Sequence, residues 1–215
     1  MVVILVGPPG AGKGTQGALL AEATGSRHIA TGDLLRAALR DGAELGRKAQ
    51  DFMNRGELVP DQLIVDLVRD VVEKMDRDLG AVLDGFPRTV GQAESLEDLL
   101  SELDRKVDMV VVLEAEDDVL VKRLTGRRSC GQCGAVYNVH FGPPEQDGIC
   151  DQCGGTLTLR PDDDPATVRR RLEVYRQETA PLVSYFDEGQ APVSRVQAGQ
   201  SVAEVQRDFR EAVGG

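Results

Sequence analysis

One stretch near the N-terminus constrains the fold more than any other feature of the sequence. Val2–Val6 is wholly apolar, the next seven residues read G-P-P-G-A-G-K, and a helical pattern follows over Gln16–Ala23. In a G-x-x-x-x-G-K loop between a strand and a helix, the glycines let successive backbone N–H groups turn toward phosphate oxygens. Lys13 can then reach the terminal phosphates. The sequence therefore predicts a nucleoside triphosphate site, although Gly14 replaces the usual Ser or Thr and leaves Thr15 to supply any metal-facing hydroxyl.

The rest of the chain alternates between strand and helix patterns. Apolar runs suited to buried strands occur at 81–84, 109–113 and 192–196, with a weaker one at 28–30. Helices are expected after Pro60 and Pro165, and Thr89–Gln92 and Ser201–Glu204 both fit a capping box. This alternation predicts an α/β fold, a parallel sheet with helices on both faces and right-handed crossovers.

Two stretches interrupt that alternation. Residues 31–59 hold two short helical patterns with no strand between them, and residues 127–160 are rich in glycine and cysteine. The second stretch also alternates over Val136–Phe141, which favours a small hairpin. We therefore expect a core that carries two inserts.

Composition disfavours two classes of partner. The 36 acidic residues outnumber the 25 basic ones, only 4% of residues are aromatic, and tryptophan is absent. Such a chain gains little from counterion release or base stacking, so general nucleic-acid binding is not expected. The N-terminal apolar run is too short to span a membrane and lacks the basic region of a signal peptide, so we expect no membrane association and a cytoplasmic location.

All four cysteines lie in the second insert, as two C-x-x-C pairs separated by sixteen residues. Cys130, Cys133, Cys150 and Cys153 match the spacing of zinc sites, and four thiolates would leave no coordination position for water. A structural Zn²⁺ is therefore predicted. It would suit a segment too short to build its own core.

Arginine and one carboxylate indicate the chemistry. Asp84 ends a buried strand, where phosphate-loop proteins place a carboxylate near Mg²⁺, and Gly85–Pro87 form a turn that brings Arg88 to the same edge. Arg123 and Arg127 are expected at i and i+4 on one helix face pointing into the second insert. Arginine suits bidentate phosphate recognition, so these side chains predict a phosphate-rich cleft.

These motifs resemble the bacterial adenylate kinase family, in its long form with a zinc-binding lid. Five motifs match the family in order and span essentially the whole chain: 7–15 (GPPGAGKGT), 31–36 (TGDLLR), 84–88 (DGFPR), 126–128 (GRR) and 169–172 (RRRL). The resemblance implies a five-stranded core formed by 1–30, 60–126 and 162–215, an acceptor-binding insert at 31–59, and a mobile lid at 127–161. It also implies a monomer that converts ATP and AMP into two ADP with Mg²⁺.

The resemblance assigns residues to both nucleotides. ATP would contact Gly10, Ala11, Gly12, Lys13, Gly14, Thr15, Arg123, Arg127, Val136, Tyr137 and Gln200. AMP would contact Thr31, Arg36, Glu57, Leu58, Val59, Gly85, Phe86, Pro87, Arg88 and Gln92, and Arg160 and Arg171 would grip the transferring phosphate. Some relatives carry a lysine at the position of Gln200, which matters little if that contact is made by backbone atoms.

Catalysis would then depend on charge rather than on a nucleophile–base pair. A phosphate monoester has a second pKa near 6, so AMP needs no general base at neutral pH. The phosphates would be positioned and neutralised by Lys13, Arg88, Arg123, Arg127, Arg160, Arg171 and a Mg²⁺ beside Asp84.

Two alternative functions remain open. One is a kinase of the same fold that accepts UMP or CMP. The other is a non-catalytic nucleotide-binding protein whose zinc ribbon binds nucleic acid, although Glu145, Asp147, Asp151 and Asp162–Asp164 would repel a phosphate backbone.

Overall fold

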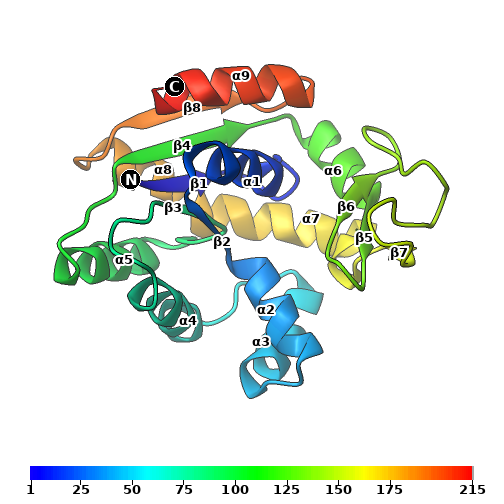
Figure 1. The fold of residues 1–215 in the computed structure, drawn as a ribbon, viewed down its shortest axis with the longest axis horizontal. Helices are drawn as coiled ribbons and strands as arrows, with labels where there is room; N and C mark the ends of the chain where they lie inside the picture. The colour runs from blue at the N-terminus through cyan, green and yellow to red at the C-terminus, as the bar shows by residue number, and fades with distance from the viewer. Residues whose placement is uncertain (215) are drawn as a thin grey trace.

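A computed structural model describes residues 1–214 of the chain. Its centre is a parallel sheet in the order β2-β3-β1-β4-β8, made of β1 (Val2–Val6), β2 (Arg27–Ala30), β3 (Ala81–Asp84), β4 (Met109–Glu114) and β8 (Val193–Gln197). β1 pairs with β3 on one side and β4 on the other. The predicted strands and their parallel arrangement are therefore confirmed, and Figure 1 shows helices on both faces.

Alternating side chains of β1 reach two separate cores. Val2, Ile4 and Val6 pack with residues of α4 (Asp61–Glu73), α5 (Val90–Glu102) and α8 (Pro181–Asp187). Val3 and Leu5 pack with residues of α1 (Lys13–Thr24), α6 (Asp117–Thr125), α7 (Pro165–Val174) and α9 (Val202–Val213). Every residue of β1 is at most 2% exposed, as expected for a strand buried on both faces.

The two interruptions of the core pattern form separate structures. Residues 31–59 contain α2 (Thr31–Arg40) and α3 (Glu44–Arg55), which pack together below the sheet in Figure 1. The cysteine-rich stretch forms a second, antiparallel sheet in the order β6-β5-β7, made of β5 (Arg127–Cys130), β6 (Val136–Asn138) and β7 (Leu157–Thr158). A short 3₁₀ helix, η1 (Pro161–Asp163), leads from this sheet into α7.

Two local expectations need correction. α6 ends at Thr125 and Arg127 begins β5, so Arg123 and Arg127 do not share a helix face. Gly126 forms the helix C-cap, and Arg127 then pairs in the ladder with Asn138. The capping box at Thr89 is half made, because the Thr89 hydroxyl accepts from the Gln92 backbone N–H while the Gln92 side chain bonds elsewhere. The box at Ser201 and Glu204 is complete.

One further segment departs from α-helical geometry. The chain continues from α7 into a π-helical turn, η2 (Tyr175–Thr179), before α8 begins.

Within residues 1–214, no helix is both long and apolar enough to cross a membrane.

Candidate active site

A cavity of about 910 Å³ lies at the carboxyl ends of the central strands, between the sheet, the α2–α3 insert and the cysteine-rich sheet. This is the edge at which open α/β sheets bind ligands, beside the strand where the order reverses. Lysine and arginine outnumber the acidic residues along its wall. Seven cationic and four anionic side chains line the cavity. The cations are Lys13, Arg36, Arg88, Arg123, Arg127, Arg160 and Arg171, and the anions are Asp33, Glu57, Asp84 and Asp162. A chain with net charge −11 thus concentrates positive charge in one cleft.

The glycine-rich loop forms the floor of the cavity directly after β1. Gly10 has φ +86°, and a Cβ there would lie 3.0 Å from the Leu120 carbonyl oxygen, so the turn requires glycine. Gly12 forms the left-handed N-cap of α1, whose first N–H groups have no partner within the helix. The loop therefore presents backbone donors and the positive end of a helix to the cavity.

Lys13 folds back over this loop. Its Nζ donates to the carbonyl oxygens of Gly7 and Pro8 at 2.7 and 2.9 Å. Burial lowers the pKa of Lys13 from 10.5 to about 8, against the opposing attraction of Asp84. Within residues 1–214, the ammonium group is therefore held in the cavity by carbonyl oxygens and makes no hydrogen bond to a carboxylate.

Asp84 lies at the end of β3 beside the loop. A Cβ on Gly14 would sit 3.3 Å from its Oδ2 atom, so the Asp84 carboxylate lies close to the start of α1. Burial acts to raise the pKa of Asp84, but His28 and Lys13 outweigh it, so the pKa lies below its ordinary value. The Asp84 carboxylate is thus ionised at neutral pH. The Thr15 side chain also lines the cavity, so a carboxylate and a hydroxyl lie beside the loop. These are the hard oxygen donors that Mg²⁺ prefers.

The turn after β3 joins the sheet to the first insert. The Gly85 carbonyl oxygen accepts from the Thr31 hydroxyl and from Arg88 Nε, both at 2.8 Å. Burial and the neighbouring Arg171 lower the pKa of Arg88. Phe86 differs from the other predicted AMP contacts: its side chain is 1% exposed, packs in the core and does not line the cavity.

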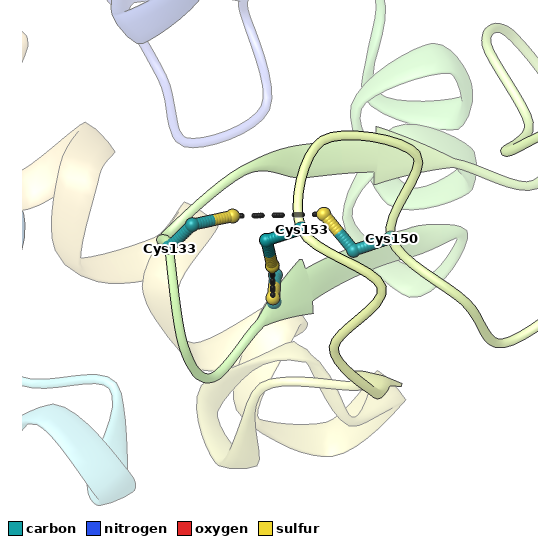
Figure 2. Close-up of side chains that lie close together, drawn as sticks. Cys133, Cys150 and Cys153 are labelled. Atoms are coloured by element: carbon teal, nitrogen blue, oxygen red, sulfur yellow. Dashed lines mark hydrogen bonds between the residues drawn. The ribbon is translucent and has the colours of Figure 1, made fainter.

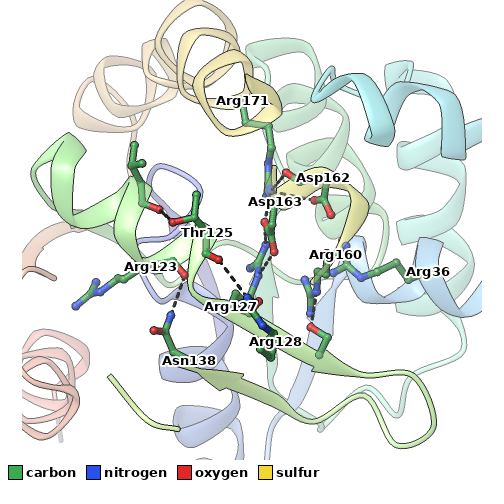
Figure 3. A network of polar contacts seen from close by, with 12 residues as sticks. Arg36, Arg123, Thr125, Arg127, Arg128, Asn138, Arg160, Asp162, Asp163 and Arg171 are labelled. Carbon is green, nitrogen blue, oxygen red and sulfur yellow. Dashed lines mark hydrogen bonds and ion pairs between the residues drawn. The ribbon is translucent and has the colours of Figure 1, made fainter. Parts of the chain in front are cut away.

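A second cluster of charges lies at the base of the cysteine-rich sheet (Figure 3). Arg127 donates from Nε and Nη2 to the two carboxylate oxygens of Asp163, at 2.7 and 2.6 Å. Arg171 Nη1 shares one of these oxygens at 2.9 Å and pairs with Asp162 at 3.0 Å. The Asp163 carboxylate is fully buried and binds both guanidinium groups. It therefore fixes the positions of Arg127 and Arg171 relative to each other.

Asp162 and Asp163 pair with arginines of the cavity, which the sequence motifs did not indicate. They were expected to add negative surface around the ribbon, but both are buried and paired with arginine. The sequence holds one signal of this: three consecutive acids between two prolines, next to an arginine run.

Arg160 connects the cysteine-rich sheet with the α2–α3 insert. Its Nε donates to the Ser129 hydroxyl at 2.7 Å, and its Nη2 lies 4.0 Å from Asp33, which also binds Arg36 at 2.6 Å. Burial, together with Arg127 and Arg36, lowers the pKa of Arg160 to about 10. Asp33 therefore links arginines of the two inserts, and Figure 3 shows Arg36 and Arg160 close together.

The opposite end of the cavity has a more apolar character. Val136, Tyr137, Phe141 and Gln200 line it, and Arg123 lies 5.6 Å from the Phe141 ring centroid. The Gln200 backbone carbonyl accepts from Arg123 at 3.3 Å, while its side-chain amide donates to Asp208 on α9. Phe141 was not singled out from the sequence, because an aromatic residue in an alternating patch has no distinguishing signal of its own.

The four cysteines form a compact cluster in the second sheet. Their Sγ atoms lie within 4.8 Å of one another, and the pairs Cys130–Cys153 and Cys133–Cys150 are each 3.5 Å apart (Figure 2). Sulfurs on a tetrahedron with Zn–S bonds of 2.3 Å would be about 3.8 Å apart, whereas a disulfide requires about 2.05 Å. The donor set and its spacing fit Zn²⁺. Leu157, Ala135 and Tyr137 supply the small apolar packing around it.

Comparison with known proteins gives one consistent result. The sequence model of the adenylate kinase family matches residues 5–191. The chain is 46% identical to an adenylate kinase of Geobacillus sp. (strain WCH70) and 44% identical to one of Bacillus subtilis (strain 168), in each case over all of this chain and 99% of the relative. It is also 48% identical to an adenylate kinase of Archaeoglobus fulgidus over 86% of each chain.

Proposed function

The chain belongs to the adenylate kinase family and catalyses the reversible conversion of ATP and AMP into two ADP, and we propose that the cavity described above holds both nucleotides end to end. The observation that carries this proposal is the set of seven cationic side chains around one cleft in an acidic protein. Two polyanions can approach each other only where such charge is already in place.

ATP would occupy the side of the glycine-rich loop. Backbone N–H groups of Gly10–Thr15 and the Lys13 ammonium would bind its phosphates, and Arg123 and Arg127 would approach them from the other side. Val136, Tyr137 and the Gln200 backbone would contact the base. The Gln200 side chain is bonded to Asp208, which supports a contact through backbone atoms.

AMP would lie against the first insert and the turn after β3. Thr31, Arg36, Glu57, Leu58, Val59, Gly85, Pro87 and Gln92 line that part of the cavity and would bind the acceptor nucleotide. Arg88, Arg160 and Arg171 would surround the phosphate that moves. Phe86 would act from within the core, by fixing the turn that carries Arg88.

No proton-transfer residue is needed for the reaction. An AMP phosphate with a second pKa near 6 is already mostly dianionic at neutral pH. The arginines and Lys13 align the two phosphates and offset the charge that builds up between them. Closure of the 127–161 segment over the cleft would exclude water and suppress transfer to it.

Two metals would complete the protein. Adenylate kinases use Mg²⁺ with ATP. Asp84 and Thr15 would hold the ion here, and it would offset phosphate charge. Zn²⁺ would be held by Cys130, Cys133, Cys150 and Cys153 in a purely structural role. We further propose that 127–161 acts as a lid and 31–59 as the acceptor-binding insert of a cytoplasmic monomer that binds neither nucleic acid nor membranes.

Acceptor choice is the test of the AMP assignment. The protein is incubated with ATP, Mg²⁺ and each of AMP, GMP, CMP and UMP, and ADP is measured. We expect AMP to be preferred, and Gln92→Ala to reduce that preference mainly by raising the KM for AMP. Comparable turnover of UMP or CMP would contradict the AMP assignment. A variant with unchanged selectivity but a loss of about 1 kcal/mol in stability would show that the Gln92 side chain only stabilises the start of α5.

A further inference from the structure

The Gln92 side chain is buried and bonded at both ends of its amide. It is 1% exposed and yet lines the cavity. Its Oε1 accepts from the Arg88 backbone N–H at 2.8 Å, and its Nε2 donates to Asp61 Oδ1 at 2.7 Å. An amide has two N–H donors and two acceptor lone pairs, so one donor and one acceptor position remain for a ligand.

The two partners fix which end of the amide is which. A backbone N–H can only donate, and an ionised carboxylate can only accept. If the amide turned over, its oxygen would face the Asp61 carboxylate and its NH₂ group would face the Arg88 N–H. The orientation that is usually ambiguous for glutamine is therefore determined by chemistry at both ends.

Asp61 is itself held in place from a second side. It lies in the first turn of α4, and its Oδ2 accepts from the Thr89 hydroxyl at 2.8 Å. That hydroxyl accepts in turn from the Gln92 backbone N–H at 3.2 Å. Both carboxylate oxygens are therefore engaged by the start of α5, which packs against α4 (Figure 1). Gln92 lines the cavity and Asp61 does not, so Asp61 would act on a ligand through Gln92.

We propose that Asp61 is a positioning residue for acceptor specificity, which sets the direction of the Gln92 amide so that it accepts a 6-aminopurine and rejects a 6-oxopurine. This inference rests on the proposed contact between Gln92 and the acceptor base. A 6-aminopurine such as adenine offers an N–H at position 6 and an acceptor at N1, which match the free lone pair and free N–H of the locked amide. A 6-oxopurine offers the reverse pattern, a carbonyl oxygen and an N1–H. Binding it would leave both groups mispaired, or would force the amide to turn against Asp61.

IMP is the discriminating probe, because it differs from AMP at this edge and keeps the same ribose, phosphate and ring size. Asp61→Asn is the discriminating variant. Its carboxamide can accept from Gln92 or donate to it, so the constraint at this end is removed while size and most contacts with Thr89 are kept. We expect kcat/KM for IMP relative to AMP to rise about tenfold, since a hydrogen bond to a charged group then no longer opposes the turned amide.

Three further variants make the result specific. Asp66→Asn is the matched control, because Asp66 on the same helix accepts from the Gln62 amide at 2.7 Å on the exposed surface. It should leave the IMP:AMP ratio within about twofold of the unchanged chain. Asp61→Glu restores a group that can only accept and should recover most of the selectivity. Gln92→Ala reports separately on the base contact.

The outcomes separate the two hypotheses. In the first case, Asp61→Asn leaves the IMP:AMP ratio of kcat/KM unchanged, while Gln92→Ala abolishes the preference for AMP. The role of Asp61 is then overturned and the base contact stands. If Gln92→Ala keeps the full preference for AMP, both fail. If Asp61→Asn relaxes the ratio and Asp66→Asn does not, and thermal unfolding shows both variants folded, the inference is supported.

Discussion

The glycine-rich loop and the cysteine-rich sheet are both short segments at the cleft, but they are ordered by different means. The loop follows β1, whose residues are at most 2% exposed, and it leads directly into α1. The cysteine-rich sheet has only three short strands, and its apolar cluster consists of Cys130, Cys150 and Leu157 with two partly buried neighbours. A cluster of that size cannot offset the conformational entropy of about thirty residues.

This difference separates chemistry from stability. The loop has its shape from the core, so its polar groups are free to bind phosphate. The cysteine-rich sheet needs an external crosslink, and its four sulfurs are occupied with holding the fold. Substitutions in the loop should therefore abolish turnover without unfolding the chain. Removal of the crosslink should destabilise the chain more than it impairs turnover at moderate temperature.

The largest effect is expected at Lys13. Lys13→Met removes the one ammonium group that the loop places at the triphosphate, and kcat should fall by about 10²–10³ or more. Thermal unfolding should not occur at a lower temperature than in the unchanged chain, because the ammonium is bonded only to two carbonyl oxygens of its own loop and its burial disfavours the charged form. A folded variant with near-normal turnover would contradict the assignment of the loop.

The same two regions show how far the sequence predicts the site. The strand, loop and helix around Lys13 are predictable because all the relevant contacts are local and the motif defines the backbone path. The alignment of Arg127 and Arg171 by Asp163 is not, because it depends on how η1 packs after β7. The helical placement of Arg127 was wrong for a related reason: pairing of β5 with β6 overrides the local spacing beyond Gly126. Thr89 and Gln92 fit a capping box in sequence, but the nearby Asp61 redirects the Gln92 amide.

Loss of metal from the cysteine cluster should have the next largest effect. We expect one Zn²⁺ per chain, and its removal by a chelator should lower the unfolding temperature by roughly 10 °C, at about 2–4 °C per kcal/mol for a chain of this length. Turnover at moderate temperature should fall less, because the catalytic charges lie outside the cluster.

Calorimetry with parallel metal analysis and activity assays measures this. Added Zn²⁺ should restore the unfolding temperature, which controls for damage by the chelator. Absence of stoichiometric zinc from carefully purified protein would refute the site. So would a chelated protein with unchanged unfolding temperature and no turnover.

A smaller effect should be visible as a pH dependence of ATP use. Burial holds the pKa of Lys13 at about 8, so the empty enzyme carries this charge below pH 8 and loses it above. We expect kcat/KM for MgATP to fall by about tenfold per pH unit above that value. The unfolded chain keeps the ordinary pKa of 10.5 and binds the proton more tightly, so the contribution of Lys13 to stability rises with pH between about 8 and 10.5.

Lys13→Arg is the control for this profile, because a guanidinium group stays charged throughout the range. Whatever its absolute rate, its kcat/KM should show no inflection near pH 8. An inflection that persists in this variant would assign the titration to another group.

The smallest effect should appear where the two regions meet, at Tyr137. Its ring lines the cavity, while its hydroxyl lies 3.6 Å from Cys150 Sγ and accepts from the Asp151 N–H at 3.0 Å. Hydrogen bonds around metal ligands orient them, and their loss commonly weakens metal binding by about tenfold. Tyr137→Phe should therefore speed zinc release to a chromogenic chelator by about five- to tenfold, while the KM for ATP changes less than twofold because the ring remains.

Tyr185→Phe is the matched control, since the Tyr185 hydroxyl bonds to Glu97 at 2.8 Å and the residue lies outside the cysteine-rich sheet. If Tyr137→Phe instead raises the KM for ATP with unchanged zinc release, the hydroxyl serves the nucleotide rather than the metal cluster. Tyr137 would then belong to the nucleotide site, although it lies in the sheet that the metal stabilises.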